Sequence, residues 1–559
     1  MPRFLVILIS SIILSGCSFL VDLRLSQCSV DADCDSLGGD FRGRECSAAG
    51  LCEVPEGEQD GVTGSGDAAS PDASTQECEV HLDCINNHFG TPHLCVEGAC
   101  LSLVSSECPL VLNEEGLQRR DPVIVGAYSL LAEGLRNSPT TLNYELAVDE
   151  IQGSTPGLHG GVDGTRRPMV MVVCEGVEAD QQSVEASLSH LVEKLSVPAV
   201  IATFNDSDLL RFAFERVAKQ HDVFFLNPLA PNQELLREDT QGLLWSILGS
   251  WPTLAATYRP AVQRAEAFQR RLTKEEILRV ALVSGTEGEA QDVSQALVQD
   301  PSTELIFNDK SARENGEEFR VFSLSSDGSN FDDVTLALLD FKPHIVVSAA
   351  DTRFIRSVVP LIEDSWSEAV PEQVPPFYVL SRFAAPLAEE FVKPGTMDIQ
   401  PRAVGINYAT VEEDALYQAY LLRLKSANRS FPGLESTENF YDVVYFLFYA
   451  MAGADSTKPL RGSNIAAGMR RIITGSTQFE VGSNALPDVL AELRQDPDFT
   501  ARFIGTMGPP DFNLENGTRQ TPSSIWCLDP SEGTVVFDAL RYDQDNNELT
   551  GDFPCFDHY

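Results

Sequence analysis

Basic residues are scarce in this sequence of 559 residues, which has 40 Lys and Arg against 83 Asp and Glu and a net charge of −43. Nucleic acids and anionic membrane surfaces are bound through basic patches, so this balance argues against both as partners. Motifs of catalysis are also missing: there is no H-E-x-x-H, no G-x-S-x-G and no G-x-x-x-x-G-K-[ST]. We therefore expect a protein that is not an enzyme and that uses no cofactor or metal.

Long apolar runs are missing after residues 4–14, and no later stretch approaches the ~20 apolar residues of a membrane-spanning helix. Residues 1–16 combine a basic start at Arg3, this short apolar stretch and a small-residue cleavage site, which is the pattern of a secretory signal. Residues 14–17, Leu-Ser-Gly-Cys, resemble a bacterial lipobox. The resemblance implies cleavage before Cys17 and lipid on its thiol and amine. The alternative is an ordinary signal peptide with a cysteine there by chance.

A lipid at Cys17 would anchor the chain in the cell envelope, outside the cytoplasm. Ser18 follows this cysteine, whereas an Asp would resemble an inner-membrane retention signal. The outer membrane or the cell surface is therefore favoured, and a periplasmic orientation stays open.

Eight of the 13 cysteines fall into two clusters of similar spacing, in residues 17–56 and 77–108. The members are Cys28, Cys34, Cys46 and Cys52, then Cys78, Cys84, Cys95 and Cys100. Modules this short cannot bury a sufficient core, so we expect disulfides, with the pairing left open. A four-cysteine zinc site is the alternative, although it normally uses closer spacing. Residues 57–76 are rich in Gly, Ser, Ala and Asp, and predict a flexible linker that forms a stalk with the lipid.

From residue 121 onward, short apolar runs alternate with stretches of helical periodicity. Strands are expected at 123–128, 168–174, 198–204, 223–226, 277–284, 319–324, 344–349 and 377–380. Helices are expected at 141–151, 181–195, 209–218, 290–297, 332–339 and 353–362. This alternation predicts parallel βαβ units in two α/β lobes, each with a doubly wound sheet. Ligands of such sheets sit beyond the carboxyl ends of the strands.

Four later segments carry a family resemblance when taken in order. Residues 227–235 read Asn-Pro-Leu-Ala-Pro-Asn-Gln-Glu-Leu, residues 441–443 read Tyr-Asp-Val, and two turns lie at 503–508 and 512–517. They resemble the S-P-A-A-T-N-P-E-L segment, the Y-D-A helix motif and the closing F-x-G-x-T-G and F-D-x-N-G turns of the type I periplasmic binding proteins, in particular the branched-chain amino-acid-binding group.

The resemblance covers residues 121–542 and implies two lobes that close on a small ligand by a hinge motion. It places the first segment of lobe 1 at 121–245, lobe 2 at 246–404, and the return to lobe 1 with the C-terminal crossover at 405–559. It also implies ligand contacts at the ends of strands in both lobes. The candidates are Tyr128, Ser129, Asp206, Ser207, Asn232, Thr286, Asp351 and Arg382.

Several candidates have a structural alternative. Ser207 and Asp351 are also suited to cap the helices that follow them. Pro231 replaces the hydroxyl residue of the family, and Arg382 falls near its acidic residue, so both departures argue against an amino-acid ligand. If Arg382 faces the cleft, an anionic ligand is favoured, whereas a solvated Arg382 would have no such role.

Two further disulfides are expected, one between Cys108 and Cys174 and one between Cys527 and Cys555. Two functions stay open. The first is a lipid-anchored solute-binding protein that captures a small ligand, an amino acid or a related compound, and serves a membrane permease or a sensor. The second is a surface interaction protein whose binding-protein fold has lost or changed its ligand.

Overall fold

The computed structural model describes residues 45–46, 52–53 and 77–551, with gaps at 120, 130–134, 161–163, 176–180, 205–206, 231–234, 236–238, 250, 287, 326, 388–398, 400–401, 410–414, 428–436, 530–533, 544–545 and 547. The chain divides into two compact units, residues 1–75 and 76–559. In the first unit, β1 (Glu45–Cys46) and β2 (Cys52–Glu53) pair antiparallel. The proposed signal, Cys17 and the linker lie outside the described residues.

The second cysteine-rich module folds as helix α2 (His81–Asn87) and a hairpin of β3 (His93–Val96) and β4 (Ala99–Ser102). Disulfides join Cys78 to Cys95 and Cys84 to Cys100, so the first cysteine pairs with the third and the second with the fourth. The expected disulfides are thus confirmed in this module. The alternative of a zinc site has no thiolates to use here, because all four sulfurs are bonded in pairs.

This module is built onto lobe 1. Leu94 and Leu103 are buried in the same hydrophobic core as Leu188 and Leu191 of lobe 1. The ring Nε2 of His190 also lies 2.9 Å from the backbone oxygen of Leu103. The short module therefore gains from lobe 1 the apolar burial that it cannot supply alone.

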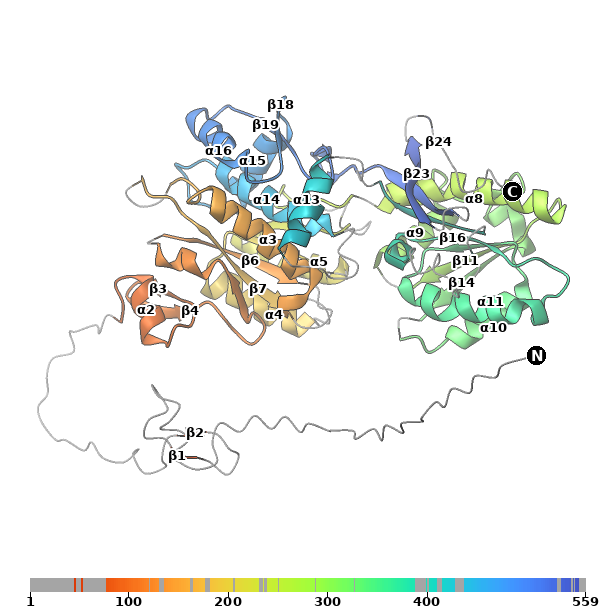
Figure 1. The fold of residues 1–559 in the computed structure, drawn as a ribbon, viewed down its shortest axis with the longest axis horizontal. Helices are drawn as coiled ribbons and strands as arrows, with labels where there is room; N and C mark the ends of the chain where they lie inside the picture. The colour runs from red at the N-terminus through yellow and green to blue at the C-terminus, as the bar shows by residue number, and fades with distance from the viewer. Residues whose placement is uncertain are drawn as a thin grey trace, which may run out of the picture. The chain divides into compact units, whose positions relative to one another are not determined.

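Lobe 1 is built on an eight-stranded sheet in the order β20-β21-β10-β9-β8-β6-β7-β5 (Figure 1). The strands are β5 (Leu110–Leu112), β6 (Val123–Ser129), β7 (Met169–Glu175), β8 (Ala199–Ile201), β9 (Phe224–Asn227), β10 (Leu244–Ser246), β20 (Phe512–Asn513) and β21 (Thr518–Arg519). Strands β6 to β10 run parallel, as the buried apolar runs predict. The edge strand β5 pairs antiparallel with β7.

Helices cover both faces of the lobe 1 sheet. Core residues of α3 (Pro139–Ser154), α14 (Glu438–Gly453) and α15 (Gly462–Ile473) pack on one face. Core residues of α4 (Gln181–Leu188) and α5 (Ser207–Ala213) pack on the other. Helix α14 is almost entirely buried, which explains its aromatic sequence. In the part of the chain that the structure describes, no helix is long and apolar enough to cross a bilayer.

Helices α13 (Ala415–Ser426) and α16 (Leu486–Gln495) complete the first face of lobe 1, since their core residues pack in the same cluster. Strand β18 (Thr477–Glu480) precedes α16 and pairs in parallel with β19 (Ala501–Ile504), which follows α16, as a separate two-stranded sheet.

Lobe 2 has a second eight-stranded sheet in the order β14-β11-β15-β16-β17-β22-β23-β24. The strands are β11 (Val280–Gly285), β14 (Phe319–Leu324), β15 (Ile345–Ser348), β16 (Phe377–Leu380), β17 (Ala403–Tyr408), β22 (Ser523–Asp529), β23 (Thr534–Asp543) and β24 (Glu548–Thr550). Its first five strands are parallel and the last three antiparallel.

Helices also cover both faces of the lobe 2 sheet. Core residues of α8 (Trp251–Thr273) and α9 (Gly288–Gln299) pack on one face, and those of α10 (Phe331–Phe341) and α11 (Val359–Ala369) on the other. The parallel strands of both lobes follow the doubly wound order 2-1-3-4-5. The expected fold class of two doubly wound lobes behind disulfide-rich modules is therefore confirmed for the described residues.

The chain crosses between the lobes three times: between β10 and α8, between β17 and α13, and between β21 and β22. The expected boundary between residues 404 and 405 falls inside β17, and the strands β22 to β24 belong to the sheet of lobe 2. We call these three connections the hinge passages.

Candidate functional site

The predicted contacts at the end of β6 are engaged within lobe 1. Tyr128 is fully buried, its hydroxyl lies 2.6 Å from Ser187 Oγ, and burial raises its pKa well above the usual range. Ser129 Oγ lies 2.6 Å from Ser138 Oγ and 2.7 Å from Thr141 Oγ1 at the start of α3. Both side chains therefore join the sheet to its helices and offer little to a ligand.

The other predicted contacts of lobe 1 lie where the structure is not described. Asp206 and Asn232 are outside the described residues, and Ser207 begins α5 with no description of its side chain. Their roles stay predictions. Nearby, Asn227 at the end of β9 donates to Ser246 Oγ (3.2 Å) and accepts from the Leu229 amide (2.9 Å), so this polar side chain is also satisfied within the lobe.

In lobe 2, two predicted contacts lie at the surface. Thr286 directly follows β11 and is exposed. Asp351 Oδ1 accepts from the Arg353 amide (2.8 Å), and Oδ2 pairs with the Arg353 guanidinium. Its carboxylate thus caps the following helix, which is the alternative that the sequence offered.

Arg382 is paired and largely buried. It begins the short helix η9 (Arg382–Leu387), and its Nε donates to Glu289 Oε1 at 2.6 Å. The side chains are 22% and 12% exposed. The guanidinium also lies 4.4 Å from the ring centre of Phe383 and 6.0 Å from that of Tyr408. Burial opposes its charge, but the Glu289 carboxylate outweighs burial and raises the pKa of Arg382.

Four buried polar atoms, one in this pair and three next to the connections between the lobes, have no hydrogen-bond partner among the described residues. They are Glu289 Oε2, Tyr408 Oη, Trp251 Nε1 and Thr521 Oγ1. Tyr408, Trp251 and Thr521 are only 5%, 3% and 2% exposed. Buried polar groups in native proteins nearly always have a partner, and an unpaired one costs about 1–3 kcal/mol.

Three of these residues lie in or beside the connections between the lobes. Trp251 begins α8 after the first passage, Tyr408 precedes the second, and Thr521 lies in the third. Gly249 has a positive φ of 129°, and a Cβ there would lie 2.8 Å from Tyr408 Cε1 and 3.1 Å from Thr521 Cβ. Only glycine allows this backbone conformation together with such close packing.

Arg519 fastens the first and third passages to lobe 1. It is 3% exposed and donates to the backbone oxygens of Ile247 (3.5 Å), Met507 (2.6 Å) and Pro509 (2.8 Å). Burial lowers the pKa of Arg519 to about 10, and the nearby Asp442 opposes this shift. The guanidinium still stays charged at neutral pH, so the hinge is held by a buried cation.

Asp442 explains why two of the resembling motifs occur together. Its carboxylate accepts from the amides of Thr506 (2.9 Å) and Met507 (3.0 Å), and also from Thr506 Oγ1 (2.8 Å). The Tyr-Asp-Val motif on α14 therefore organises the turn at residues 503–508. Burial raises the pKa of Asp442, and these donors counteract the rise. The motif serves the scaffold next to the hinge.

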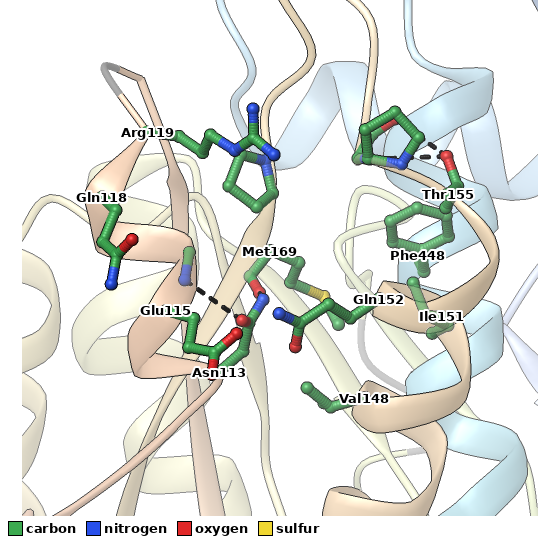
Figure 2. A pocket seen from close by; sticks show the side chains of 14 residues that line it. Asn113, Glu115, Gln118, Arg119, Val148, Ile151, Gln152, Thr155, Met169 and Phe448 are labelled. Carbon is green, nitrogen blue, oxygen red and sulfur yellow. Dashed lines mark hydrogen bonds between the residues drawn. The ribbon is translucent and has the colours of Figure 1, made fainter.

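A separate cavity of about 410 Å³ lies in lobe 1 between the short helix η2 (Glu114–Gln118) and α3. Figure 2 shows Glu115, Gln152 and Arg119 around the cavity, and Asn113 forms hydrogen bonds in its wall. Met169 at the start of β7 lines the cavity, so the cavity lies at the amino end of that strand. Ligands of doubly wound sheets bind at the carboxyl ends. We therefore place the candidate site at the hinge.

Comparison with known proteins supports the fold. No family model and no curated protein matches the sequence. Among solved structures, a leucine binding protein from Thermotoga maritima is 14% identical, with a TM-score of 0.51, and the match covers 76% of this chain and 99% of that one. A putative branched-chain amino acid ABC transporter protein from Silicibacter pomeroyi is 14% identical, with a TM-score of 0.51 and coverage of 77% and 98%.

A fatty acid ABC transporter substrate-binding protein from Thermomonospora curvata is also 14% identical, with a TM-score of 0.50 and coverage of 78% and 95%. At such low identity the likeness concerns the fold. The chain has the fold of the type I periplasmic binding proteins, as the ordered motifs predicted.

The two disulfides expected outside the modules have different outcomes. Cys108 and Cys174 are bonded, as expected. Cys527 is disulfide-bonded, but Cys555 lies outside the described residues, so that pairing stays a prediction.

Sequence reasoning identified Arg382 but missed its partner Glu289 and the unpaired residues Trp251, Tyr408 and Thr521. None of them belongs to a motif. Their common signal is position, because each of the last three flanks or lies in a passage between the lobes.

Proposed function

We propose that this chain is a lipid-anchored extracytoplasmic binding protein that captures a small ligand at the hinge between its lobes. The observation that supports the proposal is a set of buried polar atoms that have no partner among the described residues: Trp251 Nε1, Tyr408 Oη and Thr521 Oγ1 next to the passages, and Glu289 Oε2 in α9. A bound ligand would supply the missing hydrogen bonds, and each bond would then favour the liganded form.

The geometry suits a hinge mechanism. Ligand contacts on residues of all three passages would couple occupancy to the angle between the lobes, since closure follows from differential contacts with the closed form. Arg519 and Gly249 hold the passages together without touching the ligand. The bound form would then be recognised by a membrane permease or a sensor.

Isothermal titration of the intact protein, extracted in mild detergent, against small-molecule panels tests the proposal. We expect saturable binding of one class of compound that is weakened in Tyr408→Phe and unchanged in Tyr378→Phe. Tyr378 is a matched control, because it is a buried tyrosine of the same lobe whose hydroxyl already donates to Glu363 (2.7 Å). Binding that is equally strong in Tyr408→Phe would contradict a hinge site.

The lipid anchor is a separate part of the proposal and rests on Cys17. Metabolic labelling with a fatty acid would label the wild type and leave Cys17→Ser unlabelled. An unlabelled wild-type protein that is released into the soluble envelope fraction would refute the anchor and leave the binding site untouched.

A surface interaction protein is the second candidate. It is favoured by the polar groups at the strand ends of lobe 1, where Ser129 and Asn227 are satisfied internally. If no compound binds at millimolar concentration, this candidate replaces the first, and the cysteine-rich module on lobe 1 becomes the surface to investigate.

A further inference from the structure

We infer that the second cysteine-rich module, together with the cavity beside it, is a docking surface for a basic segment of another protein. The surface is separate from the hinge passages, so it serves either candidate function. Four observations support it: a cavity between the module and lobe 1, exposed apolar side chains beside that cavity, a strained aromatic residue, and the charge of the module.

A cavity of about 430 Å³ lies between the module and lobe 1. His81 and Cys95 line it from the module, and Leu195 is among the residues that line it from lobe 1. The amide of Cys95 donates to His81 Nδ1 at 2.8 Å, so α2 and β3 are held together at the cavity wall. The carboxylate and the guanidinium in the lining, those of Asp121 and Arg167, pair with each other at 3.0 Å. The cavity therefore has room for a side chain of a partner and leaves an apolar one without a charge to desolvate.

Exposed apolar side chains stand beside this cavity. Val80 and Leu82 flank His81 in the chain, and they are 38% and 45% exposed. Val96 directly follows Cys95 and is 45% exposed. Each of the three is one residue, about 3.8 Å between Cα atoms, from the hydrogen bond that joins the two segments. Apolar side chains gathered on a surface in this way mark sites of interaction.

Phe89 is strained and exposed at the same time. The Gly90 amide donates to the Ile85 oxygen (2.8 Å) as in a Schellman motif, and Phe89 has the left-handed φ of 56° that this turn requires. Glycine is the usual residue there, because a bulky side chain makes this conformation costly. Phe89 is 87% exposed, so packing within the chain does not offset the strain. A partner that covers the ring would give this aromatic residue a purpose.

Phe89 and Leu82 can be covered by one partner. They lie toward opposite ends of α2, and a helix of seven residues is only about 10 Å long. Disulfides join Cys78 to Cys95 and Cys84 to Cys100, which fixes α2 against its hairpin. Figure 1 shows α2, β3 and β4 at the margin of lobe 1. A surface that is rigid before docking loses little entropy when a partner binds.

The charge of the module selects the partner. Residues 77–107 contain five Asp and Glu and no Lys or Arg. Glu79 precedes Val80 and Glu97 follows Val96, and both carboxylates are exposed next to the apolar side chains. Such a surface repels nucleic acids and anionic lipids and attracts Lys and Arg. A protein segment in which basic and apolar side chains alternate matches both features, since its apolar groups cover the rim and enter the cavity while its cations pair with the carboxylates.

Photo-crosslinking of the full-length protein in the cells that produce it tests the inference. A benzophenone amino acid takes the place of Leu82, and in a control protein it takes the place of Leu422, which is 69% exposed on α13. We expect a discrete protein adduct from the first position and none from the second. Mass spectrometry should place the crosslink in a segment of the partner that combines apolar residues with Lys or Arg.

Variants in the crosslinking protein test the chemistry. Glu79→Lys/Glu97→Lys should lower the adduct yield at least about tenfold, because like charges then face each other. Asp364→Lys/Glu368→Lys makes the same change in net charge on exposed residues of α11 and should leave the yield unchanged. Phe89→Gly should also lower the yield about tenfold, as the loss of an aromatic anchor does. It should raise the urea midpoint of unfolding, because glycine suits the left-handed position.

Each other outcome would overturn the inference. An equal or absent yield at positions 82 and 422 would exclude a docking surface on the module. An adduct with lipid would assign the surface to the membrane. A protein adduct that survives Glu79→Lys/Glu97→Lys, or that is lost equally in the control pair, would exclude recognition by these carboxylates. A lower urea midpoint in Phe89→Gly would show that Phe89 serves the fold of the module.

Discussion

Cys108 is bonded to Cys174, and this disulfide fastens the segment that leaves the second cysteine-rich module to the second strand of the lobe 1 sheet. Both cysteines are completely buried, in the same core as Leu94 and Leu103 of the module. The bond therefore ties together two parts that also share a hydrophobic interior, and it limits how far the module can separate from the lobe.

Removal of this bond should lower the stability of lobe 1. The disulfide closes a loop of 66 residues, and loop-closure entropy predicts a loss of about 4 kcal/mol in the free energy of unfolding for Cys108→Ser/Cys174→Ser. Urea unfolding of the variant and the wild type under non-reducing conditions measures the difference. A change below about 1 kcal/mol would mean that core packing alone holds the module.

The unpaired hydroxyls at the hinge should make two variants more stable than the wild type in the absence of ligand. Tyr408→Phe and Thr521→Val remove polar atoms that are buried without partners, so each should raise the free energy of unfolding by about 1 kcal/mol. Tyr378→Phe should lower it by a similar amount, because its hydroxyl is bonded to Glu363. Chemical denaturation gives all three values, and a loss of stability in the first two variants would count against an empty binding site.

Gly249 should tolerate no side chain. Gly249→Ala places a Cβ 2.8 Å from Tyr408 Cε1 at a φ of 129°, so we expect a loss of at least about 1–3 kcal/mol and impaired ligand binding. Gly153→Ala is the control, since nothing lies within 4 Å of its added Cβ and the site is inside α3. That change should be neutral or stabilising, because alanine favours helices. Thermal unfolding distinguishes the two variants, and an unperturbed Gly249→Ala protein would mean that the passages are loosely packed.

His159 should make the protein less stable in mild acid. Burial and the charges of Arg166 and Arg494 lower the pKa of His159 to about 4. The unfolded chain therefore binds a proton near pH 6.5, whereas the folded chain does so only near pH 4. Stability from this group is complete above about pH 6.5 and is lost as the pH falls toward 4. His159→Gln should have a flatter stability profile than the wild type in this range, and identical profiles would assign the acid sensitivity to other groups.

The fold could be read from the sequence where local pattern decides it. The apolar run at 377–380 coincides with β16, which is fully buried, because buried parallel strands need continuous apolar residues. The antiparallel strands β22 to β24 could not be assigned to lobe 2 in this way. Strand β22 pairs with β17 across more than a hundred residues, and no local feature of residues 523–529 states which sheet they join.

The candidate site was harder to predict for the same reason. Trp251, Tyr408 and Thr521 come from three distant passages, and their meeting depends on how both lobes are connected. The sequence indicated Arg382 as a site residue with a choice between anion binding and solvation. Its buried pairing with Glu289 is a third state that only the tertiary structure reveals. The capping role of Asp351 could be predicted from the sequence, because its carboxylate accepts from the amide of Arg353, which is only two residues away.

Strand β5 has a consequence for how the protein is made. It covers the edge of β7, and it precedes β7 in the chain by more than fifty residues. The ribosome therefore completes the covering strand before the strand that it will cover, and β7 meets its own chain first. A chain shortened to begin after Leu112 would expose this edge to other copies, and an open strand edge is a template for aggregation. Strand β5 thus keeps the edge of β7 from pairing with another copy, whatever the two lobes bind once they have folded.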